Sequence, residues 1–171
     1  MAEAIATRRY SRQAGRAAKR VAQRLSPRAR SCLHQAQESA RARDDDHVGT
    51  EHLVLGLLAG APEIVALLAE IGITRAIFEA QLFGEPGVSP AGPIPSTPRS
   101  RQSLGFALEE ASERGSRSIE PIHLLLGVID ESELWRSLRS DGPHHLEQAA
   151  NAVGLTLGDL RKAALLLDRY R

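Results

Sequence analysis

An internal repeat constrains the fold of this 171-residue chain more than any other feature of its sequence. Shifting the chain against itself by 71 residues aligns residues 26–59 with residues 97–130 without a gap, and 12 of these 34 pairs are identical. The alignment begins at Ser26-Pro27 on Thr97-Pro98 and reaches Gly56 on Gly127. Similarity at one fixed spacing is the sequence signature of a repeated structural unit. We therefore predict that the body of the protein is a tandem duplication.

Each copy has the pattern of a set of short helices. Ser26 and Thr97 can cap a helix whose first position is proline, where the missing N–H of proline costs no hydrogen bond. Small apolar residues then follow at helical spacing, and no alternating strand pattern competes with them. The second helix of each copy is expected to begin at Gly49-Thr50 and at Pro121. The third helices follow Pro62 and Ser132 and end at Gly72 and Gly142. The fourth helices cover about residues 74–83 and 144–153.

The predicted fold class is all-α, with about eight helices in two four-helix units related by a pseudo-twofold axis, plus one added helix near the C-terminus. Glycine and proline are dense between the copies, as in a linker. Thr156 can cap the added helix. The predicted boundaries are a basic leader at 1–24, a domain at 25–153 made of repeat one (25–83), linker (84–95) and repeat two (96–153), and a terminal helix at 154–171.

Basic residues gather at the start of the chain. Residues 1–24 carry a net charge of +6, whereas the remaining residues carry −5. Such an arm can bind nucleic acid or an acidic partner through salt-sensitive attraction, or it can be an organelle transit peptide. We favour a third interpretation, a solvated or partly helical leader without a partner of its own. Binding of nucleic acid or of an acidic partner through this arm is the alternative function.

Signatures of enzymes are almost absent from the sequence. The only lysines, Lys19 and Lys162, do not follow glycine, so the chain has no phosphate-binding P-loop, and it has no G-x-S-x-G motif. Asp44, Asp45, Asp46, His47 and His52 are close in sequence, but their spacing matches no standard zinc site. We predict that the protein is not an enzyme and holds neither a metal nor a cofactor.

The sequence also indicates a compartment. It has no run of 18 apolar residues and no secretory signal, which predicts a cytoplasmic protein that does not enter a membrane. Its one cysteine, Cys32, cannot form an internal disulfide and is expected to be a buried thiol, in agreement with a reducing compartment.

Polar residues near the start of the second helix deserve comparison between the copies. His52 and His123 are equivalent, which favours a structural role in capping or in core hydrogen bonding. Glu51 lies in the first turn, where the helix dipole favours a carboxylate. Free N–H groups beside that carboxylate could also bind a ligand that carries both an anion and a guanidinium. His144-His145 is expected to open a surface helix.

The run Gly49-Thr50-Glu51-His52-Leu53-Val54-Leu55-Gly56-Leu57-Leu58 closely resembles the Clp ATPase N-terminal domain, also called the Clp repeat. The second-copy run His123-Leu124-Leu125-Leu126-Gly127 and the segment Ile94 to Arg99 add to the resemblance, which covers about residues 25–153. It implies a non-catalytic module of the Clp system that binds substrates, adaptors or Clp ATPase and protease subunits. The motor modules of that family are missing, which implies a stand-alone accessory, competitor or sequestering factor.

The resemblance also implies a ligand. In the ClpC branch, the glutamate of the repeated motif helps to bind phosphoarginine, a degradation mark on substrates. Thr50 and Glu51 match that motif in the first copy, so they are the candidate ligand-binding residues. Glu120, Pro121 and Ile122 replace the glycine, threonine and glutamate in the second copy. We therefore expect one phosphoarginine-type site to be retained and the other to be lost.

Overall fold

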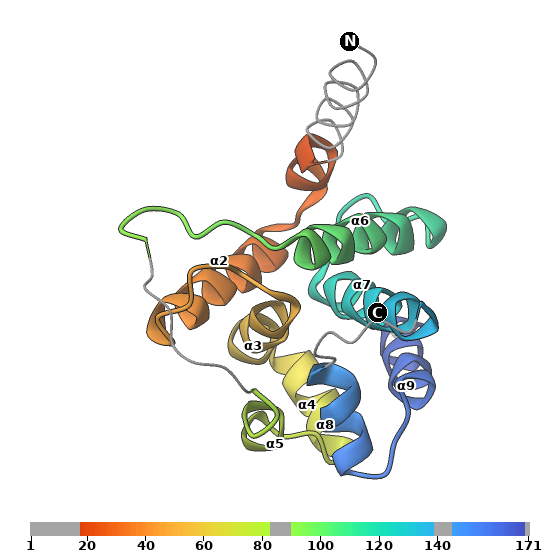
Figure 1. The fold of residues 1–171 in the computed structure, drawn as a ribbon. Helices are drawn as coiled ribbons and strands as arrows, with labels where there is room; N and C mark the ends of the chain where they lie inside the picture. Colours follow the sequence, from red (N-terminus) through yellow and green to blue (C-terminus); the bar gives the residue numbers. More distant parts are fainter. Residues whose placement is uncertain (1–17, 83–89, 139–144, 170–171) are drawn as a thin grey trace.

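The structure is a computed structural model that describes residues 18–82, 90–138 and 145–169. Its helices pack into one body with no strand among the described residues, which confirms the predicted all-α class (Figure 1). Residues 18–24 are helical and precede the first labelled element. The helices that follow are α2 (Pro27–Ala42), α3 (Thr50–Gly60), α4 (Pro62–Glu70), α5 (Arg75–Glu79), α6 (Pro98–Glu113), α7 (Pro121–Ser137), α8 (His145–Ala152) and α9 (Leu157–Arg169).

The long helices begin at the predicted caps. The Ser26 hydroxyl accepts a hydrogen bond from the N–H of Ala29 at 3.1 Å, and the Thr97 hydroxyl accepts one from the N–H of Ser100 at 3.1 Å. Each copy then packs its first helix on its second, so α2–α3 and α6–α7 form the largest interfaces. The apolar helices α3 and α7 also contact each other and form the centre of the core. The two copies therefore share one core.

Backbone hydrogen bonds link the copies reciprocally at the points where these helices begin. The Ser26 N–H donates to the Ile119 carbonyl at 3.0 Å, and the Ile119 N–H donates to the Arg24 carbonyl at 2.6 Å. The residues that are equivalent at the 71-residue shift make the same two bonds. The Thr97 N–H donates to the Val48 carbonyl at 3.0 Å, and the Val48 N–H donates to the Pro95 carbonyl at 2.8 Å. This exchange confirms a duplicated, pseudo-twofold arrangement.

Glycine lets the two helices of each copy approach closely. A Cβ atom at Gly56 would lie 2.3 Å from the carbonyl oxygen of Cys32 on α2. At the equivalent Gly127, a Cβ atom would lie 2.3 Å from the carbonyl oxygen of Ser103 on α6. Real Cβ atoms do not come this close to backbone oxygen. The two matching glycines therefore set the same helix crossing in both copies.

The expected third helix of the second copy was wrong. Ser132 does not start a new helix, because α7 continues without a break to Ser137. In the first copy the break comes at Pro62, which lacks an N–H and cannot extend α3 in register. The aligned residue of the second copy is Glu133, which permits a continuous helix. The predicted helix end at Gly142 lies outside the described residues.

The end of the chain repeats the end of the first copy at a larger spacing. Gly72 and Gly154 both have positive φ, 86° and 78°, and each precedes a threonine that caps the next helix. The pairs α4–α5 and α8–α9 therefore correspond at a shift of 82 residues, 11 more than before. The added terminal helix is present as α9, and it is the counterpart of α5. We propose to end the second repeat at 169 instead of 153.

Ion pairs fasten α9 to the second copy. The Arg161 guanidinium donates to Glu110 on α6 at 2.6 Å and also pairs with Asp130 on α7. Arg114 at the end of α6 contacts Asp168 at 3.0 Å. Burial and a hydrogen bond with Glu110 raise the pKa of Asp130 to about 7, against the lowering effect of Arg161. The pKa of Glu110 is lowered instead, so Asp130 is the carboxyl group of this pair that holds a proton more readily.

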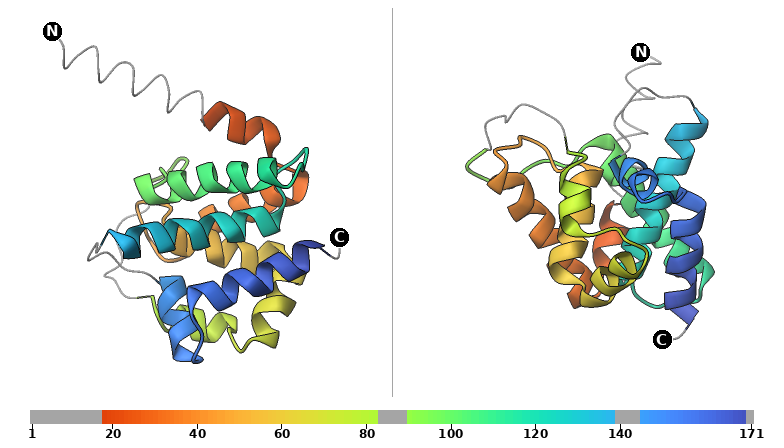
Figure 2. Two further views of the ribbon diagram at one scale, coloured as in Figure 1. Left: turned by 90° about the vertical axis from the view of Figure 1, so that its right-hand side faces the viewer. Right: turned by 90° about the horizontal axis from the view of Figure 1, so that it is seen from below.

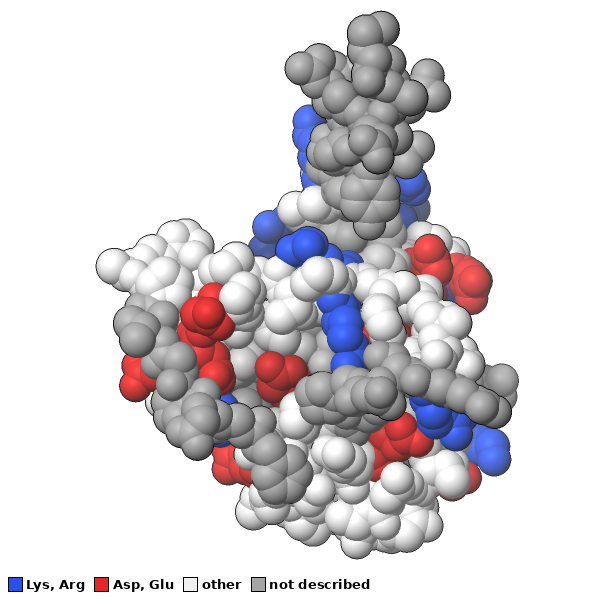
Figure 3. All heavy atoms as spheres, in the orientation of Figure 1, with Lys and Arg blue, Asp and Glu red and all other residues white. Residues whose placement is uncertain are grey.

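The predicted leader and linker both join the folded body where the structure describes them. Val21 is buried, and the Arg24 guanidinium donates to the Arg117 carbonyl at 2.9 Å. In the linker, Ile94 is buried and its carbonyl accepts from the Gln37 amide at 3.3 Å. Basic side chains surround the base of the N-terminal segment, whereas the opposite end around α4, α5 and α8 is mostly uncharged (Figure 3). Arg8, Arg9, Arg12 and Arg16 lie outside the described residues, so the arm's binding role stays a prediction.

In the described part of the chain, no single helix has both the length and the apolar composition to cross a membrane. Together α3 and α4 would meet both conditions, but their axes are bent by 104° at the break between them. Most of α3 is buried in the shared core.

Candidate functional site

The predicted site residues lie at the start of α3, where an unusual cap leaves a carboxylate available. Gly49 is the N-cap and offers no side chain to the helix. Instead His52, three residues later, accepts the Gly49 N–H on Nδ1 at 3.0 Å and holds Asp45 Oδ2 with Nε2 at 2.9 Å. The predicted structural role of His52 is therefore confirmed. Because a histidine satisfies the cap, Glu51 is not needed for it.

The Glu51 carboxylate folds back over the first residue of the motif. A Cβ atom at Gly49 would lie 2.1 Å from Glu51 Oε1, so no other residue at position 49 leaves the carboxylate where it is. The Glu51 side chain is 26% exposed. The glycine and glutamate of the motif thus act together: one leaves the space that the other fills.

The charged form of Glu51 is favoured in this place. Burial by itself raises the pKa of the carboxyl group, but the contact of Glu51 Oε1 with His52 Nδ1 at 3.2 Å and the backbone N–H of Glu51 outweigh it. The net result is a pKa below the ordinary value of glutamic acid. The carboxylate is therefore negative at neutral pH and suited to a cationic group.

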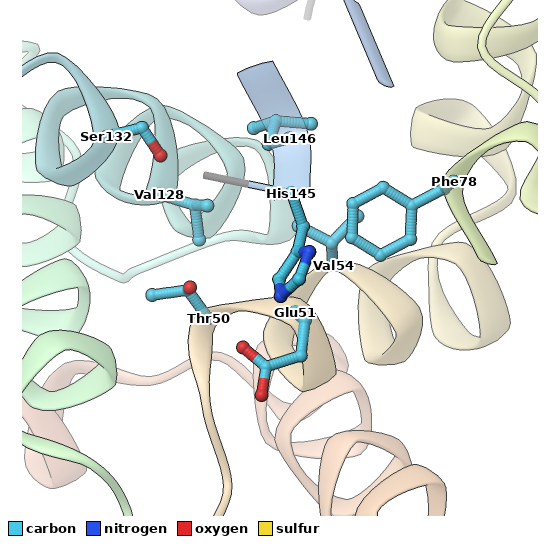
Figure 4. Close-up of a pocket in the computed structure, with 8 residues that line it drawn as sticks. All are labelled: Thr50, Glu51, Val54, Phe78, Val128, Ser132, His145 and Leu146. Atoms are coloured by element: carbon cyan, nitrogen blue, oxygen red, sulfur yellow. The ribbon is translucent and has the colours of Figure 1, made fainter. Parts of the chain in front are cut away.

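A shallow hollow of about 200 Å³, including solvent at its mouth, lies beside Thr50 and Glu51 (Figure 4). It unites elements of both copies: α3 and α5 come from the first, and α7 and α8 from the second. Its lining combines hydroxyl, carboxylate and imidazole groups with apolar walls. The lining residues are Thr50, Glu51, Val54, Phe78, Val128, Ser132, His145 and Leu146.

His145 is the site residue that the sequence did not reveal. We expected it on the surface, which was wrong: only 8% of it is exposed, and its ring points into the hollow beside Glu51 (Figure 4). Its Nδ1 lies 2.8 Å from the Gln81 carbonyl after α5. No periodic pattern marks this placement, because it depends on the longer connection between α7 and α8. His144 lies outside the described residues.

The equivalent position in the second copy is closed. Pro121 and Ile122 stand in place of Thr50 and Glu51, and both are buried. His123 keeps its structural role, accepting the Glu120 N–H on Nδ1 at 3.0 Å, as His52 does at Gly49. The Glu120 carboxylate instead accepts from the Ser118 hydroxyl at 2.7 Å. At this end of α7, buried apolar residues therefore stand in place of the carboxylate of the first copy.

Metal and thiol chemistry find little support in the described residues. Within residues 18–82, 90–138 and 145–169, no group of three or more His, Cys, Asp or Glu side chains could hold a metal ion. Asp45, from the acidic cluster that the sequence singled out, is instead a partner of His52. Cys32 is buried, and burial raises the pKa of its thiol to about 11. The thiol is therefore protonated at neutral pH and not a nucleophile.

The fold and the site define a duplicated helical domain with a shallow hollow at the start of one central helix. Residues 10–90 match the family model of the Clp repeat (R) N-terminal domain. Chaperone protein ClpC2 of Oryza sativa subsp. japonica is 32% identical over 160 residues, 86% of this chain and 17% of that protein. The ClpC ATP-binding subunit of Staphylococcus epidermidis is 34% identical over 113 residues, 64% of this chain and 14% of that protein. The chain thus spans about a sixth of the length of these curated relatives.

Solved structures show the same fold. The N-terminal domain of ClpD from Arabidopsis thaliana aligns with a TM-score of 0.64 and 21% identity, covering 87% of this chain and 99% of that one. The N-terminal domain of Hsp104 from Candida albicans aligns with a TM-score of 0.62 and 14% identity, covering 84% and 91%. The chain belongs to the Clp N-terminal domain family. Domains of this family are protein-interaction modules of Clp chaperones and ATPases.

Proposed function

We propose that this chain is a non-catalytic recognition module of the Clp system whose Thr50–Glu51 hollow binds a phosphoarginine-type group on substrate or adaptor proteins. One observation carries the proposal: a charged carboxylate is held at the N-terminus of α3 without serving as the cap of that helix. A carboxylate binds guanidinium through paired hydrogen bonds. The helix N-terminus beside it attracts an anion.

The two halves of such a ligand have complementary partners in the hollow. Glu51 suits the guanidinium, while the Thr50 hydroxyl and the first N–H groups of α3 suit the phosphoryl group. Val54, Phe78 and Leu146 form apolar walls that suit the alkyl part of the side chain. Because Ile122 is buried where the second copy would need its carboxylate, we propose one such site in the chain.

Calorimetric titration with free phosphoarginine tests this proposal. We expect saturable binding at one site, and weaker binding of arginine or inorganic phosphate alone, since each offers only half of the contacts. Glu51→Gln keeps the size of the side chain and removes its charge. It should weaken phosphoarginine binding at least tenfold, because an ion-paired hydrogen bond becomes a neutral one.

Glu38→Gln is the matched control, because it removes an acid from the half-exposed surface of α2. It should bind phosphoarginine as the unaltered protein does. Absence of binding by the unaltered protein, or equal binding by the Glu51→Gln variant, would contradict the proposed ligand. Circular dichroism of each variant confirms that the helices remain.

The wider role follows from the same module. We propose that the domain binds Clp subunits, adaptors or marked substrates and thereby alters their degradation. Affinity purification with the unaltered protein and with the Glu51→Gln variant separates partners held through the hollow from those held elsewhere. A degradation assay of the recovered proteins, with and without the module, then shows whether it promotes or blocks proteolysis.

A further inference from the structure

The hollow beside Glu51 is completed by the second repeat. The first repeat supplies Thr50 and Glu51, whereas α7 and α8 of the second supply the opposite wall. The first two helices of the copies are related by a shift of 71 residues, whereas the last two are related by a shift of 82. The 11 additional residues lie in the chain between the start of α7 and the start of α8. In the first copy the corresponding helix, α4, begins directly after α3 with Pro62. The two repeats thus differ in length directly before His145.

His145 is held with one ring nitrogen committed and the other available. Its Nδ1 lies 2.8 Å from the Gln81 carbonyl, and a carbonyl oxygen can only accept, so Nδ1 carries the proton. In the neutral ring, Nε2 then has a lone pair and no proton. Within the described part of the chain, Nε2 has no hydrogen-bond partner, and it is not among the side-chain atoms that are both fully buried and unpaired, so it keeps contact with solvent. The side chain is more than nine-tenths buried and points into the hollow (Figure 4).

Two acceptors therefore face the same small space from different repeats. Glu51 lines this space from the first repeat, and His145 lines it from the second. An acceptor that meets only solvent can take a hydrogen bond from a ligand that displaces that solvent. The guanidinium of phosphoarginine is planar and keeps four of the five N–H donors of arginine, so it can donate to both acceptors together.

We propose that Nε2 of His145 accepts a hydrogen bond from the guanidinium of the bound ligand and is a specificity-determining contact of this site. The inference rests on the proposed function of the Glu51 hollow as a guanidinium site. It adds that the ligand bridges the two repeats, with the carboxylate from the first and the imidazole from the second. An ammonium group has no planar fork and should bind less well than a guanidinium.

Two substitutions separate ligand contact from structural support. His145→Asn places an amide N–H near the position of Nδ1, so it can keep the bond to the Gln81 carbonyl while Nε2 is removed. His145→Gln places its amide near the position of Nε2 and gives up the bond to Gln81. We expect His145→Asn to weaken phosphoarginine binding about tenfold with little change in thermal unfolding. His145→Gln should retain more affinity than His145→Asn despite its larger loss of stability.

The unaltered protein supplies a second measurement that does not depend on a variant. The ¹⁵Nε2 resonance of His145 should shift on saturation with phosphoarginine, because its lone pair gains a donor. An unchanged resonance, or equal affinity of the His145→Asn variant and the unaltered protein, would overturn the inference. If the unaltered protein binds and Glu51→Gln does not, such a result removes only the role of His145. If the unaltered protein fails to bind, the proposed function fails first.

Discussion

Within the four residues Gly49 to His52, one side chain completes the cap of α3 and another lines the candidate site. In an ordinary capping box, an acidic side chain three residues after the cap returns to the N-cap N–H. Here His52 takes that part, since Nδ1 accepts from Gly49. Glu51, one residue earlier, is then not needed as the cap, and it lines the hollow. The second copy keeps the histidine and has no carboxylate at this position, which separates the structural role of the histidine from the recognition role that we propose for Glu51.

Substituting Gly49 tests this division of roles. Gly49 has an ordinary φ of −87°, so alanine introduces no backbone strain, but its Cβ would displace the Glu51 carboxylate. We expect Gly49→Ala to lower the free energy of unfolding by about 1 kcal/mol or less, since only a cap preference is lost. Phosphoarginine affinity should fall about tenfold because the carboxylate moves.

Gly105→Ala on α6 is the control for that experiment, because nothing lies within 4 Å of a Cβ atom at Gly105. Its calorimetric titration should match that of the unaltered protein. Unchanged affinity of the Gly49→Ala variant would show that the carboxylate position observed here is not the one that matters for binding.

Helices α3 and α7 carry the duplication most clearly. Both are apolar on most sides, both begin with a histidine-satisfied cap, and both pass the preceding helix at a glycine. They differ where Pro62 ends the first and Glu133 allows the second to continue. Ser132, which suggested a helix start, lines the hollow from inside this continuous helix. One proline thus decides whether this segment is one helix or two.

Gly127→Ala tests the helix crossing. Its Cβ would lie 2.3 Å from a backbone oxygen of α6, which cannot rotate away as a side chain can. The two helices must separate, and overpacking of this kind costs about 2–3 kcal/mol. We expect a loss of that size in the free energy of unfolding, measured by urea denaturation. Gly105→Ala again serves as control, and a loss below about 0.5 kcal/mol for Gly127→Ala would refute the crossing geometry.

Across the molecule, α9 closes the second copy through charges, whereas the ion pair described on α5, Arg75 with Glu79, lies within that helix. Glu110, Asp130 and Arg161 join three helices, and Asp168 extends the network to Arg114 (Figure 2 shows α9 along α7). Burial raises the pKa of Asp130 to about 7, so the folded protein retains a proton that the unfolded chain has lost above about pH 4. This network therefore makes the stability of the domain depend on pH.

The sign of that dependence can be measured. Because the folded-state pKa of Asp130 is raised, its contribution to the free energy of unfolding declines as pH rises from about 4 to 7. Asp130→Asn cannot titrate and can still donate to Glu110. Between pH 5 and pH 8, the unaltered protein should lose about 2–3 kcal/mol more than this variant in urea denaturation. Identical pH profiles would show that Asp130 does not carry the proton.

Much of this architecture could be predicted from residues that are neighbours in the chain. The caps at Ser26 and Thr97, the spacing of 71 and the helix start at Thr50 are local signals, because a cap or a helical turn is made within a few residues. Glu51 stands out from the same kind of signal, while the resemblance to the Clp motif adds Thr50, and both residues line the hollow. Local chemistry therefore sufficed for the class of fold, and with the resemblance it predicted one side of the candidate site.

The other side of the site was settled only by tertiary packing. The second copy has 11 more residues than the first before its last two helices, and His145 follows this insertion. A periodic pattern in the sequence does not predict where a side chain after such an insertion lies. The correspondence of α9 with α5 was hidden for the same reason, since the spacing changes from 71 to 82 within the copy. Sequence patterns report which face of an element is apolar, whereas the meeting of Glu51 and His145 depends on how two repeats pack around one shared core.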